Sequence, residues 1–170
     1  MPIRVFIADD HPVVRDGLRL TIERSGKAIV VVGEASDGTE VLKMAGTRPV
    51  DIYILDITMP NLNGIDTARE LRKKAPASKI IMLSLHDTKA KVEEALAAGA
   101  RGYLTKEMAT RNVVEAVTEV HAGRYYLCPK IAHFVVEAGR VVEKGAGKHG
   151  LASAALTGQE RKVLQLIAEG

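Results

Sequence analysis

Three carboxylates and one lysine stand where apolar runs of the sequence end. Asp9 and Asp10 follow RVFIA, Asp56 follows DIYIL, and Lys106 follows RGYLT. Carboxylates that converge in a partly dry cleft repel one another, so a cation is needed among them. Oxygen ligands favour Mg²⁺, and the lysine supplies a second, fixed positive charge. A pocket that holds a carboxylate, Mg²⁺ and an ammonium group is suited to accepting a phosphoryl group.

The segment that follows Asp56 supports a chemical use of this carboxylate. By itself, an Asp at the end of a strand is common before a turn, and the Asp9–Asp10 pair by itself often only caps the following helix. The sequence DITMPNLNG, however, places Pro60 and Gly64 in the loop after Asp56. Proline fixes the backbone and glycine permits a tight turn, so we expect this loop to hold the carboxylate at the edge of the sheet.

Four further side chains fall near the same predicted edge. Ser84 ends an apolar run, and its hydroxyl is able to donate to a phosphoryl oxygen, although a serine there often only makes a local turn. Tyr103 precedes Lys106 by three residues and, taken alone, is typical of a half-buried strand residue. His11 and His86 flank the predicted cleft, and we interpret both as rim residues rather than ligands.

The elements that must position these residues follow from an alternation of apolar runs and amphipathic segments. Strands are predicted over residues 4–8, 29–34, 51–55, 79–83 and 102–105, and helices near 13–25, 38–46, 65–74, 88–98 and 111–122. Asp37-x-x-Glu40 is a capping-box pattern, and Asp87 and Thr110 are candidate N-caps. Five βα units in succession predict a doubly wound parallel α/β sheet with helices on both faces. Such sheets bind ligands at the carboxyl ends of their strands.

Composition limits the class of protein. Of the 170 residues, 46% are hydrophobic and 26% are charged, which is ordinary for a globular domain with a smaller appendage. No apolar run approaches the roughly 18 residues that a membrane helix needs, so we expect no membrane association. The single cysteine, Cys128, excludes an internal disulfide framework and indicates a cytoplasmic protein. The net charge of +3 neither requires nor excludes nucleic acid.

The alternation ends after Gly123. Residues 130–143 carry one helical apolar stripe, and the Gly-, Ala- and Ser-rich stretch that follows is interpreted as a flexible linker. Within it, GAGKHG matches a dinucleotide-binding pattern by letter only, because no strand precedes it and no helix opens at its third glycine. The final LTGQERKVLQLIAEG combines a capping box with an apolar helical face. A single helix cannot bury that face alone, so we expect it to belong to a domain that continues past Gly170.

The spacing of the candidate residues closely resembles the receiver domain of bacterial two-component response regulators, over about residues 1–122. The positions that carry this resemblance are Asp9, Asp10, Asp56, Ser84, Tyr103 and Lys106. The motifs DITMPNLNG, LSLHD and GYLTKE, together with the C-terminal segment, are similar to the NarL/FixJ subfamily of transcription regulators. The resemblance implies a flavodoxin-like, five-stranded receiver with strand order 2-1-3-4-5. It also implies a helical and flexible linker over residues 123–155, and the first part of a truncated LuxR-type helix-turn-helix domain over 156–170.

The resemblance implies a division of labour among the acidic residues. Asp56 would accept a phosphoryl group from the phosphohistidine of a sensor histidine kinase. Asp10, Asp56 and the backbone carbonyl of Thr58 would bind Mg²⁺ directly, and Asp9 would act through water. Mg²⁺ keeps several waters and needs few protein carboxylates, which agrees with this small ligand set.

The same resemblance implies how the phosphorylated state is sensed. Ser84 and Lys106 would hold the phosphoryl oxygens, and Tyr103 would change rotamer as the switch. The added charge would draw Ser84 and Lys106 inward and bias a two-state element. Leu85 is bulkier than the small residue common at that position of the family, which bears on access of the phosphoryl donor.

Partners and alternative functions follow from the same pattern. We expect the parent protein to bind DNA through its C-terminal domain, whereas residues 1–170 would lack the recognition helix. A homodimer through the first and fifth helices is an open possibility. One alternative is an aspartyl-phosphate phosphotransferase enzyme, which usually has a second acid close after the nucleophile, where this chain has Thr58. The other is a flavodoxin-like cofactor binder, which gives no reason for Lys106 among three acids.

Overall fold

Strands and helices alternate along the described part of the chain, which comprises residues 1–85, 88–129 and 131–132 of this computed structural model. The strands are β1 (Ile3–Ala8), β2 (Ile29–Ala35), β3 (Ile52–Asp56), β4 (Lys79–Ser84), β5 (Gly102–Thr105) and β6 (Tyr126–Leu127). The helices are α1 (Pro12–Arg24), α2 (Gly38–Met44), α3 (Gly64–Lys74), α4 (Lys89–Ala97) and α5 (Lys106–His121).

The strands form one parallel sheet in the order β2-β1-β3-β4-β5-β6. The predicted order 2-1-3-4-5 is therefore confirmed, but the sheet has six strands rather than five. The sixth strand lies in the segment predicted to be linker and pairs Tyr103 with Leu127 at the outer edge of β5. A strand of two residues is too short to show a periodicity of two, so the sequence pattern does not reveal it. It covers backbone groups that an edge strand would otherwise expose.

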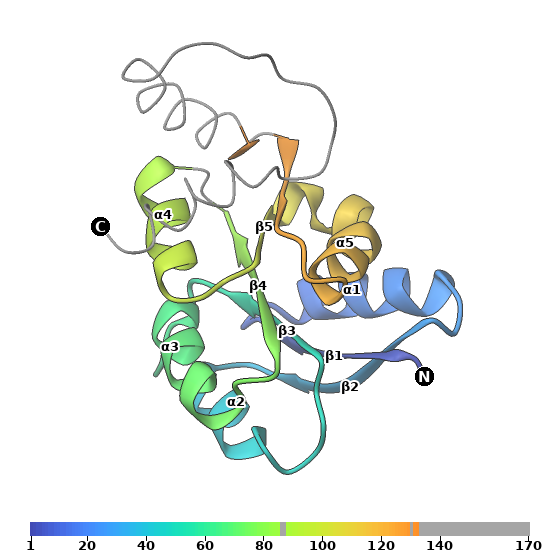
Figure 1. Cartoon of the computed structure of the whole chain (residues 1–170), viewed down its shortest axis with the longest axis horizontal. Coiled ribbons are helices and arrows are strands. Elements are labelled where there is room, and N and C mark those ends of the chain that lie inside the picture. Colours follow the sequence, from blue (N-terminus) through green and yellow to red (C-terminus); the bar gives the residue numbers. More distant parts are fainter. Residues whose placement is uncertain (86–87, 130, 133–170) are drawn as a thin grey trace.

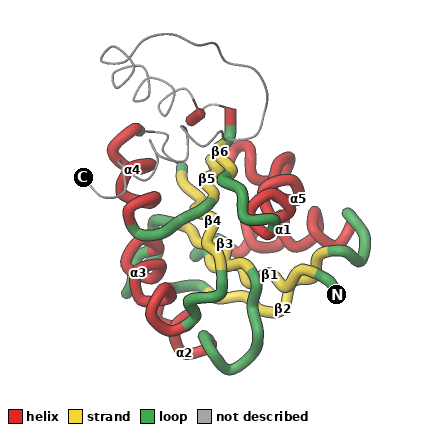
Figure 2. The backbone as a smooth tube through the Cα atoms, viewed as in Figure 1, coloured by secondary structure: helices red, strands yellow, loops and turns green. Residues whose placement is uncertain are grey.

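Helices cover both faces of the sheet. Helices α1 and α5 lie together on one face, and α2, α3 and α4 lie on the other (Figure 1, Figure 2). Every residue of β3 is buried, as is all of β4 except its first residue. This continuous burial is expected for parallel strands with helices on both sides, and it explains the uninterrupted aliphatic runs in their sequences.

Most elements lie close to their predicted bounds, but α5 does not. It begins at Lys106 with Thr105 as its N-cap, five residues before the start predicted at residue 111. The segment KEMA consists of good helix formers, so the helix continues back to the end of β5 and Thr110 lies inside it rather than at its N-cap. Lys106 is therefore held by the first turn of a helix. Its position follows directly from where β5 ends.

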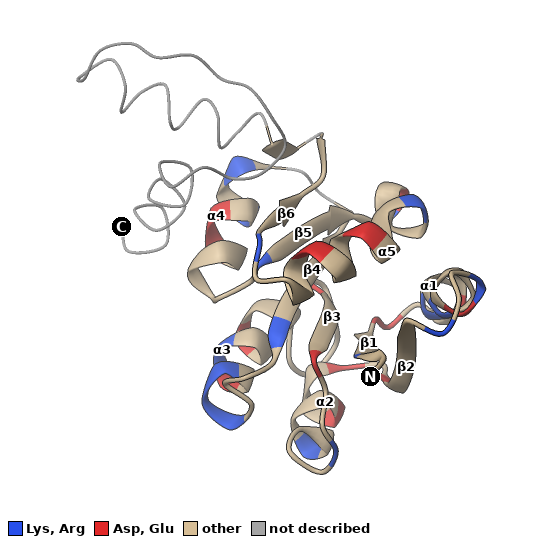
Figure 3. Cartoon of the chain, turned by 45° about the vertical axis from the view of Figure 1, so that its right-hand side comes forward, with Lys and Arg blue, Asp and Glu red and all other residues tan. Residues whose placement is uncertain are grey.

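Several predicted features lie outside the described residues. These are the rim residue His86, the N-cap Asp87, the helix over 130–143 apart from two residues, the rest of the linker and the segment 156–170. In the described part, no helix has the length and apolar character needed to cross a membrane. Charged side chains lie along the outer helices, with basic residues at the end of α3, where they suit the negative end of the helix dipole (Figure 3).

Gly64, the first residue of α3, is required by a close approach of two backbone segments. A Cβ atom built at this position would lie 2.1 Å from the backbone oxygen of Asp56. The backbone N–H of Gly64 also donates to the carbonyl of Ile57 at 3.0 Å, which closes the base of the loop after β3. The missing side chain of Gly64 thus lets the first turn of α3 pack directly against the backbone of Asp56.

We predict that Gly64→Ala destabilises the domain by about 2 kcal/mol or more, because a backbone carbonyl next to a strand end cannot move aside. Gly17→Ala is the matched control. Gly17 lies inside α1, and a Cβ atom there would meet only a methyl group of Thr110 in α5, at 3.6 Å. Helix propensity should therefore make this variant more stable by roughly 0.5–1 kcal/mol. Urea unfolding of both variants measures the difference, and equal effects would contradict the packing explanation.

The opposite end of the sheet from the strand carboxyl ends is held by an ion pair between β1 and the residue before β3. Arg4 Nη2 lies 2.7 Å from Asp51 Oδ1, and Arg4 Nε donates to Asp51 Oδ2 at 2.9 Å. The backbone N–H of Arg4 donates to the same Oδ2 at 2.8 Å. These hydrogen bonds from Arg4 lower the pKa of Asp51 to about 2 from its ordinary 3.8.

This pKa predicts a pH-dependent contribution to stability. Because the pKa of Asp51 is lower in the folded state than its ordinary value, the contribution is present above pH 3.8 and is lost as the pH falls towards about 2. Asp51→Asn should therefore lower stability at pH 7, and its difference from the parent chain should shrink below about pH 4. Urea unfolding at several pH values tests this, with Asp16→Asn at an exposed pair as the control. A difference that is constant with pH would contradict the assignment.

Candidate functional site

A lysine and two buried carboxylates meet at the carboxyl edge of the sheet. Asp56 ends β3 and is 1% exposed, and Asp9 follows β1 and is fully buried. Lys106 Nζ lies 2.7 Å from Asp56 Oδ2 and 2.7 Å from Asp9 Oδ2. The contact with Asp56 is a hydrogen bond, whereas the contact with Asp9 Oδ2 is an ion pair without hydrogen-bond geometry. The predicted convergence of these three residues is therefore observed.

The sheet itself brings these groups together. Strand β1 pairs with β3, so that Ala8 lies opposite Leu55 and the residues after them, Asp9 and Asp56, emerge side by side. Beyond β3 the ladder continues, because the Ile57 N–H donates to the carbonyl of Leu83 at 2.9 Å. The site is thus fixed by strand register rather than by flexible loops, and a shift of one residue would turn each side chain to the other face.

Burial and charge act against each other in this cluster. Burial, with the nearby charge of Asp9, raises the pKa of the Asp56 carboxyl above its ordinary value, although the hydrogen bond from Lys106 opposes part of this change. Burial by itself lowers the pKa of the Lys106 ammonium, but its contacts with Asp56 and Asp9 outweigh burial and raise it. Lys106 is therefore a fixed cation. One ammonium group does not neutralise two carboxylates, so the site attracts a further cation.

Two more residues complete an acidic cluster at the opening of the site. His11 Nδ1 lies 2.7 Å from Asp10 Oδ1 and 3.0 Å from Asp9 Oδ1. One ligand atom from each of Asp9, Asp10, His11 and Asp56 lies within 4.8 Å of the others. His11 is 57% exposed, in keeping with a rim position, but its ring nitrogen faces the acids. These contacts are not among the predicted roles of His11, although its position directly after two acidic residues is a sequence signal for them.

The donor set of this cluster fits a hard divalent cation. Three of its four members offer carboxylate oxygens, which Mg²⁺ prefers over nitrogen ligands. The buried Asp9 Oδ2 contacts the Lys106 ammonium, but a carboxylate oxygen has more than one lone pair, so it still has capacity for a metal ion or for a metal-bound water. Asp10 is partly exposed at the mouth of the cluster, so a cation can reach it from solvent. The predicted metal residues Asp9, Asp10 and Asp56 are thus grouped in space.

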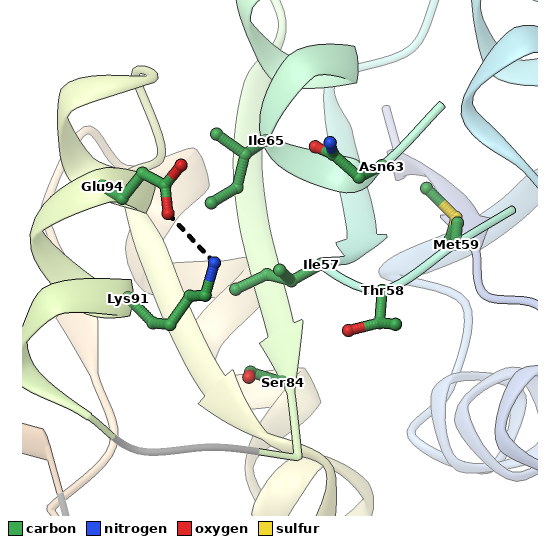
Figure 4. A pocket seen from close by; sticks show the side chains of 8 residues that line it. All are labelled: Ile57, Thr58, Met59, Asn63, Ile65, Ser84, Lys91 and Glu94. Atoms are coloured by element: carbon green, nitrogen blue, oxygen red, sulfur yellow. Dashed lines mark hydrogen bonds and ion pairs between the residues drawn. The ribbon is translucent and has the colours of Figure 1, made fainter. Parts of the chain in front are cut away.

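Thr58 and Ser84 line a hollow of about 230 Å³ together with Ile57 and Met59, which lie in the same loop after β3. The Thr58 N–H donates to Asp56 Oδ1 at 3.2 Å, and Ser84 is buried at the end of β4. The hollow runs between α3 and α4, where Lys91 and Glu94 form an ion pair across its far wall (Figure 4). The hollow is therefore lined by the residues that directly follow Asp56, although the Asp56 side chain is not part of its lining.

Tyr103 is fully buried in β5, the next-to-last strand of the sheet. It pairs with Met82 of β4 on one side and with Leu127 of β6 on the other. Its backbone carbonyl accepts a hydrogen bond from the Cys128 N–H at 3.2 Å. The structure thus places this residue inside the sheet, one strand away from Ser84, rather than beside Asp56.

Comparison with known proteins agrees with this geometry. The family model for the response regulator receiver domain matches residues 5–118. The response regulator UvrY of Escherichia coli K12 is 34% identical over 168 residues, which cover 99% of this chain and 75% of UvrY. The nitrate/nitrite response regulator protein NarL of the same strain is 32% identical over 169 residues, covering 99% of this chain and 76% of NarL.

Solved structures give the same result. A LuxR-family two-component response regulator from Aurantimonas sp. SI85-9A1 superposes with a TM-score of 0.76 at 35% identity, covering 83% of this chain and 99% of that one. The receiver domain of the putative response regulator NarL from Mycobacterium tuberculosis superposes with a TM-score of 0.68 at 35% identity, covering 72% of this chain and 98% of that domain.

These relatives are regulatory proteins rather than metabolic enzymes, and none of them favours the phosphotransferase alternative. The NarL and UvrY type of response regulator consists of transcription regulators in two-component systems. The chain therefore belongs to the response regulator family, and residues 5–118 form its receiver domain.

Proposed function

We propose that Asp56 is the residue that accepts a phosphoryl group from a sensor histidine kinase. The observation that carries this proposal is the buried Asp56 carboxylate, held 2.7 Å from the Lys106 ammonium at the edge of the sheet beside an open acidic cluster. In the transfer, an oxygen of Asp56 forms a bond to phosphorus and the phosphohistidine nitrogen leaves. Asp9 is also buried, but its contact with the Lys106 ammonium lacks hydrogen-bond geometry, whereas Asp56 accepts a hydrogen bond from it.

Mg²⁺ would be held by Asp10, Asp56 and the Thr58 backbone carbonyl, with Asp9 acting through a bound water. When bound, the ion offsets the negative charge that gathers on the phosphoryl oxygens during transfer. Lys106 supplies a second positive charge that is already in place, since its ammonium contacts both buried carboxylates. Such fixed charges stabilise a transition state without rearrangement at the moment of reaction.

Ser84 and Tyr103 would report the phosphorylated state. A phosphoryl group on Asp56 adds charge and acceptor oxygens, and Ser84 directly follows Leu83, the residue of β4 that pairs with Asp56. Movement of Ser84 shifts the end of β4, which is paired with β5 and hence with Tyr103. We propose that a rotamer change of Tyr103 carries this shift towards the outer part of the sheet.

The regulatory output would be DNA binding. We propose that residues 1–122 act as the receiver, 123–155 as a linker and 156–170 as the start of a LuxR-type helix-turn-helix. Homodimerisation through α1 and α5, which pack together on one face of the sheet, is part of this proposal (Figure 1). A cytoplasmic location is supported by the single cysteine, which is buried and unpaired.

The acceptor is tested by intact mass after incubation with a small phosphodonor and Mg²⁺. We expect a gain of one phosphoryl group in the parent chain and none in Asp56→Asn, because the amide is not a nucleophile under these conditions. Asp51→Asn, at the opposite end of the sheet, should gain the group as the parent chain does. A gain that survives Asp56→Asn, or no gain in the parent chain, would reject the assignment.

The competition between Lys106 and the metal gives a second prediction. The ammonium and Mg²⁺ attract the same carboxylates, so Lys106→Met should bind Mg²⁺ about tenfold more tightly, which corresponds to about 1.4 kcal/mol of lost repulsion. The same variant should be less stable without Mg²⁺, since two buried carboxylates lose their partner. Calorimetric titration and thermal unfolding measure the two effects, with Lys79→Met as the control. Unchanged or weaker Mg²⁺ binding would show that the two cations do not share these ligands.

A further inference from the structure

Among the described residues three carboxylates are buried, and only two of them belong to the cluster around Lys106. The third is Asp37, which is 8% exposed. It follows β2, so it lies at the same carboxyl edge of the sheet as Asp9 and Asp56. Asp37 contacts neither Lys106 nor the other two buried acids, so it has no direct role in the phosphoryl transfer proposed for that cluster.

The two oxygens of Asp37 hold two different parts of the chain. Oδ1 accepts from the backbone N–H groups of Thr39 at 2.7 Å and Glu40 at 3.0 Å, and so caps α2 as predicted. Oδ2 accepts from Asn61 Nδ2 at 2.9 Å, 24 residues away in the loop after β3. The Thr39 hydroxyl also donates to Oδ1 at 2.6 Å, and this hydrogen bond is the largest cause of the lowering of the Asp37 pKa to about 2, followed by those from Glu40 and Asn61. Asp37 is therefore a carboxylate at neutral pH and acts only as an acceptor.

The loop held by Asp37 is the one that contains Thr58. It begins at Ile57 and is closed at its base by the hydrogen bond from the Gly64 N–H to the Ile57 carbonyl. Its far side is held by Asp37 and by the Gly38 N–H, which donates to the Leu62 carbonyl at 3.2 Å. Asn61 lies between these points with a φ of 62°, a left-handed conformation. Asn tolerates this conformation, but it still needs support from its surroundings.

We propose that Asp37 is a positioning residue for the metal site, because its hydrogen bond to Asn61 fixes the loop that presents the Thr58 carbonyl. The inference rests on the proposed function, in which this carbonyl is a ligand of Mg²⁺. Loss of the hydrogen bond leaves the cluster of Asp9, Asp10 and Asp56 unchanged but removes one of the two contacts that hold the far side of the loop, so that only the hydrogen bond from Gly38 to Leu62 remains there. Partners that orient metal ligands typically contribute 10- to 100-fold to affinity, so a more remote tether should contribute about 3- to 10-fold.

The variants separate the effect of the Asp37–Asn61 hydrogen bond from the effect of Asp37 as the N-cap of α2. Asp37→Ser keeps an equally good N-cap for α2 but is too short to reach Asn61. Asn61→Gly keeps the left-handed backbone and removes only the amide, and because Asn61 is exposed this variant should fold. The double variant Asp37→Asn with Asn61→Asp exchanges the two groups and preserves one amide-to-carboxylate hydrogen bond and the total charge. Asp51→Asn is the matched control, since its carboxylate has a similarly low pKa at the far end of the sheet.

Two measurements are made on each variant with Mg²⁺ as the probe. The dissociation constant comes from calorimetric titration, and the rate of phosphorylation from intact mass at limiting and at saturating Mg²⁺. We expect Asp37→Ser and Asn61→Gly to raise the dissociation constant about 3- to 10-fold, and to slow phosphorylation mainly at limiting Mg²⁺. The exchanged pair and Asp51→Asn should stay within about twofold of the parent chain.

The outcomes are distinguishable. Mg²⁺ binding that is unchanged in both Asp37→Ser and Asn61→Gly would overturn the inference, as would an equal loss in Asp51→Asn, which would show an effect of stability alone. Failure of the exchanged pair to restore affinity would show that the hydrogen bond is not the cause. If the parent chain neither binds Mg²⁺ nor is phosphorylated, the proposed function fails first, before the role of Asp37 is in question.

Discussion

The structure depends on two buried carboxylates that share one ammonium group. Asp9 and Asp56 both lie 2.7 Å from Lys106 Nζ, and all three groups are largely withdrawn from water. Removing charges from water costs several kcal/mol per ion, and a single cation returns only part of it. Such a cluster persists only when the surrounding fold holds it in place. It is also prepared for a second cation, because one negative charge remains uncompensated.

Much of the domain can be understood as the support for this cluster. The parallel register of β1, β3 and β4 sets the three strand ends at one edge, and their continuous aliphatic burial supplies the stabilising free energy. Gly64 lets the backbone of α3 pass against Asp56, and α5 begins at Lys106 so that the ammonium is anchored by a helix. The ion pair of Arg4 and Asp51 holds the other end of the same strands. The stabilising ion pair thus lies at one end of the strands and the candidate site lies at the other.

The sixth strand, at the outer edge of the sheet, connects the segment after α5 to β5. Strand β6 pairs with β5 beside Tyr103, and Tyr126 Oη donates to Glu115 of α5 at 2.9 Å and accepts from Asn112 at 3.0 Å. Burial, with these contacts to Glu115, raises the pKa of Tyr126 to about 12. The start of the segment after α5 is therefore bound to the strand that carries the proposed switch. A change at β5 would reach that segment through backbone hydrogen bonds.

The sequence indicated the alternation of strands and helices and the sheet edge at which Asp9, Asp56 and Lys106 converge, whereas the strand order 2-1-3-4-5 followed from the resemblance to receiver domains. It could do so because apolar periodicity and the position of a residue at a strand end are local properties, and parallel sheets bring such ends together. Tertiary structure decided what depends on distance between separate segments. The tether from Asp37 to Asn61, which are 24 residues apart, and the pairing of a two-residue strand with β5 both join separate segments of the chain. No periodicity records them, because each is fixed by how neighbouring elements pack rather than by the residues next to it.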